Sequence, residues 1–150
     1  HLCLLAGWPM QKWRLNEAVA TFEDLEKKGF IPNVVIYNVI IDGLCEAGKI
    51  KDAANMFSKL LSRGLQPDCT TYNIMMKGIC KKGLLTQANQ LLGKMEKHGC
   101  RPDWITYNTL IRGFLNNNEV QGALQLIDVM TAKGFQADAQ IASLVFDLLS

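Results

Sequence analysis

The chain has 150 residues, and its 16 Lys and Arg against 14 Asp and Glu give a formal net charge of +2. Its hydrophobic content of 49% is enough for a buried core and too high for a disordered tail. The nearly balanced charge excludes a polybasic arm that binds any polyanion by bulk electrostatics. No apolar run approaches the roughly 18 residues that a membrane-spanning helix needs, so we expect a soluble protein.

The residue types that would support catalysis or metal binding are scattered. The five cysteines form no C-x-x-C pair, which favours reduced thiols over a disulfide framework. His1 and His98 lie far from any cysteine or acidic cluster, so we expect no metal site. There is no Ser/His/Asp set, no H-x-E motif with paired cysteines and no phosphate-binding glycine loop. The sequence therefore predicts no enzyme and no cofactor.

The chain repeats itself every 35 residues, a period typical of repeat proteins. Series of proline, glycine, alanine and aspartate keep this interval. The Tyr-Asn dipeptides also keep it, at Tyr37-Asn38, Tyr72-Asn73 and Tyr107-Asn108. The complete units are residues 34–68, 69–103 and 104–138. Residues 1–33 are an incomplete leading unit, and residues 139–150 are a truncated trailing unit that holds a first helix only.

Each unit has the apolar spacing of two helices. The second unit shows the i, i+3, i+4, i+7 pattern in its first half at Tyr72, Met75, Met76 and Ile79, and again in its second half at Ala88, Leu91, Leu92 and Met95. Gly48, Gly83 or Asn118 stands at the turn between the two, and Thr86 is expected to cap a second helix. Because one hairpin cannot bury its own apolar face, hairpins stack. The pattern predicts an all-α fold, an α-solenoid.

A second glycine series falls inside the first helix of each unit, at Gly43, Gly78 and Gly113, where glycine costs about 1 kcal/mol relative to alanine. We expect close approach of the two helices of one hairpin to explain it. Cys45 and Cys80 share one phase of the repeat and are expected to be small apolar fillers.

A polar stripe follows the first helix of each unit. The stripes are Val35, Asn38 and Asp42, then Thr70, Asn73 and Lys77, then Ile105, Asn108 and Arg112. Because first helices of stacked hairpins lie about 8–10 Å apart, the stripes should form one lane on the concave face. Asn is a poor residue in the early turns of a helix, so its recurrence needs a reason. The alternatives are a local backbone hydrogen bond or simple exposure to water.

An aspartate ends each unit, so Asp68 should lie level with Asn38. It also caps the helix that follows. One amide and one carboxylate per layer, flanked by an apolar residue, suit a planar polar ligand that repeats. A nucleobase fits, with its edge hydrogen-bonded by the Asn/Asp pair. Its faces would be covered by Val35, Thr70 and Ile105.

The amino-acid sequence closely resembles the pentatricopeptide repeat family over essentially its whole length. The 35-residue units, the Tyr-Asn in the first helix and the Pro-Asp ending carry the likeness, as in "VVIYNVIIDGLCEAG", "CTTYNIMMKGICKKG" and "WITYNTLIRGFLNNN". The units resemble the uniform-length P class and its restorer-of-fertility-like branch in plants. "FQADAQIASLVFDLLS" looks like the C-terminal end of such an array. The resemblance implies a right-handed superhelix, taken from the C-terminal part of a longer plant organellar protein.

The resemblance also implies a code of one RNA base per repeat. In the family, the fifth and last residues of a unit specify the base. The matching pairs are Asn38 with Asp68, Asn73 with Asp103, and Asn108 with Asp138. This combination favours uridine and tolerates cytidine, which predicts three consecutive uridines read 5′ to 3′. The second residues, Val35, Thr70 and Ile105, match the positions that sandwich the bases.

The expected partner is single-stranded RNA, an organellar transcript whose processing, stability or translation would change. We expect the mitochondrion, with the chloroplast as the alternative. Lys77, Lys81 and Arg112 are candidate phosphate contacts, and a charged solvated face is an equal alternative. A peptide-binding scaffold similar to tetratricopeptide repeats is the competing function, although that family's period of 34 and its W-x-x-L-G-x-x-Y pattern do not match. Apolar ends at residues 4–5 and 144–149 predict self-association of the isolated fragment.

Overall fold

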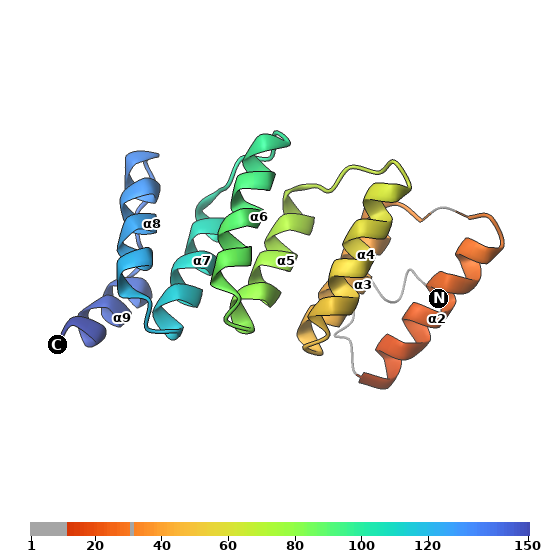
Figure 1. Cartoon of the computed structure of the whole chain (residues 1–150), viewed down its shortest axis with the longest axis horizontal. Coiled ribbons are helices and arrows are strands. Elements are labelled where there is room, and N and C mark those ends of the chain that lie inside the picture. Colours follow the sequence, from red (N-terminus) through yellow and green to blue (C-terminus); the bar gives the residue numbers. More distant parts are fainter. Residues whose placement is uncertain (1–11, 31) are drawn as a thin grey trace. The chain divides into compact units, whose positions relative to one another are not determined.

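The computed structural model describes residues 12–30 and 32–150 of the protein. These residues form eight helices and no strand (Figure 1). The helices are α2 (Lys12–Lys27), α3 (Val34–Glu46), α4 (Ile50–Ser62), α5 (Cys69–Lys81), α6 (Leu85–Lys97), α7 (Trp104–Asn116), α8 (Val120–Ala132) and α9 (Ala139–Leu149). The first helix of every unit after the leading one therefore starts at the unit's first residue. None of these helices is long and apolar enough to cross a membrane.

The chain divides into two compact units, His1–Gly78 and Ile79–Ser150, with the boundary inside α5. In the described part of the first unit, α3 and α4 form a hairpin and α2 packs on α3. In the second unit, α7 and α8 form a hairpin, and both α6 and α9 pack on α7. Figure 1 shows both hairpins as adjacent helices joined by a short turn. The predicted all-α fold of helical hairpins is confirmed.

The turn inside each hairpin needs a residue in the left-handed region. Gly48 and Gly83 have φ values of 75° and 73°, and Asn118 takes the same place at 61°. Asn is the side chain that best tolerates this conformation, so the third hairpin keeps the same turn without glycine. The helix after the turn starts at once. Thr86 consequently lies inside α6, whose N-cap residue is Leu84, and its predicted capping role is wrong.

Buried tyrosines fix the rotation of the first helices. Tyr37 is fully buried, and its ring meets Phe22 edge to face at a centroid distance of 4.8 Å. Tyr107 is fully buried in the second unit. Because the next residue along a helix is turned by about 100°, Asn38 and Asn108 lie at the edge of the buried face. Burial of the tyrosine thus determines where each asparagine points.

The glycines inside the first helices mark the close approach of consecutive repeats. A Cβ on Gly78 of α5 would lie 2.7 Å from Sγ and 2.9 Å from Cβ of Cys45 on α3. A Cβ on Gly113 of α7 would lie 2.7 Å from Cβ of Cys80 on α5. Both contacts join the first helices of successive repeats, so for Gly78 and Gly113 the expectation of close approach within one hairpin is wrong. The cysteines are the small fillers expected, and they face these glycines.

The last helix has exposed apolar side chains. Phe146 is 73% exposed and Leu149 is 66% exposed. The other predicted apolar end, residues 4–5, lies outside the described residues. Self-association of the isolated chain stays a prediction.

Gly78→Ala should destabilise the protein by about 1–3 kcal/mol, because the added methyl group overlaps Cys45, which is held by its own helix. Gly93→Ala is the matched control. Gly93 is also helical, and its Cβ would meet nothing within 4 Å. That change should stabilise the protein by about 0.5–1 kcal/mol through helix propensity alone. Urea unfolding of the three proteins measures both effects, and equal stabilisation by both alanines would contradict the packing described.

Candidate nucleic-acid interface

In the first compact unit, a hydrogen bond joins Asn38 and Asp68, which are 30 residues apart in sequence. Asn38 is only 8% exposed, and its Nδ2 donates to Oδ1 of Asp68 at 3.2 Å. Its Oδ1 accepts a hydrogen bond from the Thr71 hydroxyl at 2.6 Å. Both ends of the amide are therefore held, with the nitrogen toward Asp68 and the oxygen toward Thr71. The amide orientation is fixed before any ligand arrives.

Asp68 also begins the next first helix. Its Oδ1 accepts from the backbone N–H of Thr71 at 2.9 Å, and its own N–H donates to Oγ1 of Thr71 at 3.1 Å. This reciprocal arrangement is a capping box. Burial raises the pKa of the Asp68 carboxyl, but hydrogen bonds from Thr71 and from the Asn38 amide outweigh it and hold the pKa below its ordinary value. The carboxylate is ionised at neutral pH.

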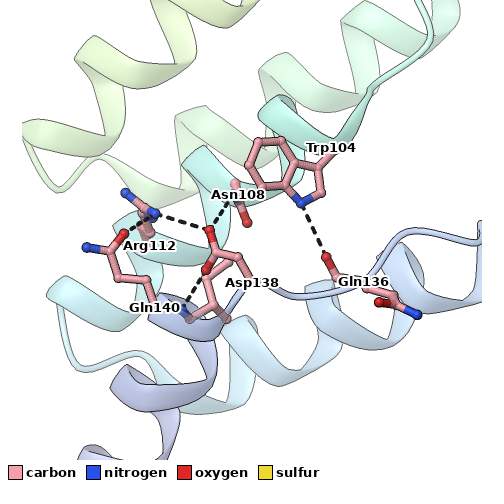
Figure 2. A network of polar contacts seen from close by, with 7 residues as sticks. Trp104, Asn108, Arg112, Gln136, Asp138 and Gln140 are labelled. Carbon is pink, nitrogen blue, oxygen red and sulfur yellow. Dashed lines mark hydrogen bonds and ion pairs between the residues drawn. The ribbon is translucent and has the colours of Figure 1, made fainter.

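The second compact unit, Ile79–Ser150, contains an equivalent pair, Asn108 and Asp138 (Figure 2). Asn108 is 6% exposed, and its Nδ2 donates to Oδ2 of Asp138 at 3.0 Å. The other carboxylate oxygen accepts from the backbone N–H of Ile141 at 2.8 Å and so caps α9. The largest cause of the lowered pKa of Asp138 is this backbone hydrogen bond. Burial opposes it, and Asn108 and Arg112 add to it.

The two pairs differ at the third residue of the 35-residue repeat that follows each pair. Thr71 holds the oxygen of Asn38 in the first unit. Ile141 takes the corresponding place in the second compact unit and has no hydroxyl. Oδ1 of Asn108, which is buried, therefore makes no hydrogen bond to any described residue. The orientation of Asn108 therefore depends on Asp138 alone.

The middle pair of the predicted code is divided between the units. Asn73 lies on α5 and is half-buried. Asp103 is the N-cap residue of α7, where its side chain accepts from the backbone N–H of Thr106 at 3.0 Å in a second capping box. The capping roles predicted for Asp68 and Asp103 are both confirmed. The roles of all six residues in base recognition stay a prediction.

Apolar side chains stand exposed beside the pairs. Val35 is 57% exposed and Ile105 is 54% exposed, and Thr70 at the same position of its repeat is also exposed. Single exposed apolar side chains are common on protein surfaces, so the exposure alone assigns no ligand to them. Their placement is consistent with the predicted contact with the faces of bases.

The candidate phosphate contacts have partners within the protein. Nζ of Lys77 lies 3.6 Å from the Glu46 carboxylate, with both side chains exposed. Lys81 is exposed at the end of α5. Nη2 of Arg112 pairs with Oδ2 of Asp138 at 3.2 Å and also contacts Oε1 of Gln140 (Figure 2). Arg112 thus contacts the carboxylate of the predicted pair, a location that its spacing alone does not indicate.

Two further residues belong to the site and were missed in the sequence. Thr71 appears in the pattern Asp-x-x-Thr, which recurs at residues 103–106 and is a readable capping signal. Its hydrogen bond to Asn38 has no signal in a single sequence. Gln140 stands at the second position of the trailing unit, where the other units have Val, Thr and Ile. That departure from the pattern can be read from the sequence alone.

Two repeat-family models match the chain. The "PPR repeat family" model matches residues 32–81, 70–116 and 102–147, and the "Pentatricopeptide repeat domain" model matches residues 10–47. No curated protein matches.

Solved structures share the fold. The pentatricopeptide repeat protein PPR10 from maize is 23% identical with a TM-score of 0.84, over 98% of this chain and 21% of that one. PPR10 in complex with an 18-nt psaJ RNA element is 24% identical with a TM-score of 0.81, over 98% and 22% of the two chains. The PPR domain of Arabidopsis thaliana PRORP1 in complex with tRNA is 14% identical with a TM-score of 0.81, over 99% and 76%. The chain thus spans about a fifth of the maize protein.

Asp68→Asn should flatten the acid dependence of stability. The folded-state pKa of Asp68 is below its ordinary value of 3.8, so its contribution is present above that value and is lost as the pH falls through the folded pKa. Unfolding free energies measured from pH 5 to pH 2 should fall less steeply in the variant. Thr71→Val, which removes one donor and keeps the carboxylate, should give an intermediate slope. Identical slopes for all three proteins would contradict this electrostatic assignment.

Proposed function

The chain belongs to the pentatricopeptide repeat family, and from this premise we propose that it binds single-stranded RNA with one base per repeat. Two of its structural relatives are solved in complex with RNA, one with an 18-nt element and one with tRNA. Both likenesses lie below 25% identity, so the inference also needs support from the residues of this chain.

The observation that carries the proposal is the held Asn–Asp pair beside an exposed apolar side chain. Asn38 has a second N–H besides the one that Asp68 accepts. Oδ2 of Asp68 has no hydrogen-bond partner among the described residues. The Asn38 amide, the Thr71 backbone N–H and the Thr71 hydroxyl, whose one proton is shared with Asn38, all meet Oδ1. A pyrimidine edge is complementary to this pair. Uracil presents carbonyl oxygens to the amide N–H and its N3–H to the carboxylate.

We propose that the three complete repeats bind consecutive uridines, with cytidine tolerated, because all three have the Asn/Asp combination. The base-reading residues are Asn38, Asp68, Asn73, Asp103, Asn108 and Asp138. Val35, Thr70 and Ile105 would cover the base faces. The RNA would be an organellar transcript, mitochondrial or alternatively chloroplast, in the manner of restorer-of-fertility-like proteins. Binding would act sterically, by covering a segment that processing enzymes, nucleases or ribosomes otherwise reach, with no catalytic step by this chain.

Three bases limit the affinity. A base contact with its stacking contributes about 1–3 kcal/mol, and ordering the strand and losing its free motion oppose binding. The dissociation constant for this chain should therefore lie roughly between micromolar and millimolar. The near-neutral charge predicts a shallow dependence on salt.

Titration of the chain with octamers of RNA tests the proposal. An octamer with a central UUU should bind more tightly than an oligo-A octamer of the same length. Asn38→Ser should move the preference of the first repeat from uridine towards a purine, because the amide that matches uracil is lost. Asn89→Ser on the exposed face of α6 is the matched control and should change nothing. Equal binding of U and A octamers, as a peptide-binding scaffold would show, contradicts the proposal.

A further inference from the structure

The third repeat holds an arginine at its base-reading pair. Oδ2 of Asp138 receives Nδ2 of Asn108 at 3.0 Å and Nη2 of Arg112 at 3.2 Å. Its Oδ1 receives the backbone N–H of Ile141 at 2.8 Å. Figure 2 shows Asn108 and Arg112 both directed at this carboxylate. Each oxygen of Asp138 thus accepts a hydrogen bond, and Oδ2 accepts two, one of them from a cation.

The first repeat lacks this arginine. Asp42 stands at the position that Arg112 takes in the third repeat. All the hydrogen bonds that Asp68 accepts from described residues meet Oδ1, which leaves Oδ2 as an open acceptor. The two repeats have the same Asn/Asp pair by sequence, but they present different hydrogen-bonding groups.

A second contact holds the arginine at the pair. Nη2 of Arg112 also donates to Oε1 of Gln140. Gln140 stands at the second position of the trailing unit, the position of the residues proposed to cover base faces. Arg112 is 41% exposed in its side chain, so a ligand can approach the guanidinium, although its Nε–H is buried. The guanidinium therefore contacts both the Asp138 carboxylate and Gln140, the residue at the position proposed to cover base faces.

The chemistry of the two pyrimidines distinguishes these arrangements. Uracil has a donor at N3 and needs an acceptor opposite it, whereas cytosine has acceptors at both N3 and O2. Guanidinium offers five N–H donors and no acceptor. Arg112 competes for Oδ2, the oxygen that Asn108 also bonds, and adds donors, which favours cytosine relative to uracil.

We propose that Arg112, held by Asp138 and Gln140, is a specificity-determining residue that shifts the third repeat from uridine towards cytidine. This inference rests on the proposed RNA-binding function. It predicts that two repeats with the same pair of base-reading residues discriminate uridine from cytidine differently, the first more strongly than the third.

The test compares octamers with central UUU, CUU and UUC at one fixed salt concentration. The first repeat faces the first of these bases and the third repeat faces the last. For the unaltered chain, replacing U by C should weaken binding more at the first base than at the last. Arg112→Gln should raise the preference for U over C at the last base by about fivefold, since a competing charged hydrogen bond is removed. The preference at the first base should stay unchanged.

Two variants make the result specific to Arg112. Lys77→Gln removes the cation at the same position of the second repeat, where its partner is Glu46. It should leave the U-to-C ratio at the last base unchanged. Asp42→Arg places a guanidinium beside Asp68 and should lower the preference for U at the first base. The change in U preference that Asp42→Arg causes does not depend on the stability of the Arg112 variant. Circular dichroism verifies the folding of each protein.

The outcomes separate this inference from the proposed function. If no octamer binds above background, the proposed function fails and the inference fails with it. If UUU binds better than oligo-A but Arg112→Gln leaves the U-to-C ratio at the last base unchanged, the inference is wrong and the proposed function stands. If Arg112→Gln weakens UUU and UUC equally and reduces the salt dependence, Arg112 is a phosphate contact, and the inference is again wrong.

Discussion

The hydrogen bond from an asparagine of one repeat to the aspartate that caps the next is the interaction on which the rest of the site depends. Asp68 starts α5 and also holds Asn38 on α3, so the start of one helix and the amide of the preceding one are fixed together. Asp138 does the same for α9 and Asn108. A recognition group built into the repeat interface needs no ordering when a ligand binds, which lowers the cost of association.

The electrostatics of the two Asn–Asp pairs agree with the proposed contact with base edges rather than with phosphates. Asp68 stays ionised because its hydrogen bonds lower its pKa. A carboxylate near a phosphate backbone is unfavourable unless a donor on the ligand meets it. The cations nearby are already paired, Lys77 with Glu46 and Arg112 with Asp138. Together these features suit a ligand recognised by its hydrogen-bonding edge.

Much of the fold could be predicted from periodicity, because the 35-residue interval, the turn residues and the aspartate caps are local signals. The adjacency of Asn38 and Asp68 followed from the repeat length. The partner of Gly78 could not be predicted, because a repeated glycine indicates a close neighbour but not which helix supplies it. The contacts of Arg112 could not be predicted either. A long side chain selects its partner in three dimensions, and Asp138 is 26 residues away.

The most direct test of the central claim follows the side-chain amide signals of Asn38 and Asn108 by NMR during titration with RNA. Assignment comes from the loss of each signal on substitution by serine. The account predicts that both amide signals shift with a UUU octamer and change little with an oligo-A octamer. Shifts confined to other surfaces, with both amides unaffected by bound UUU, would contradict it.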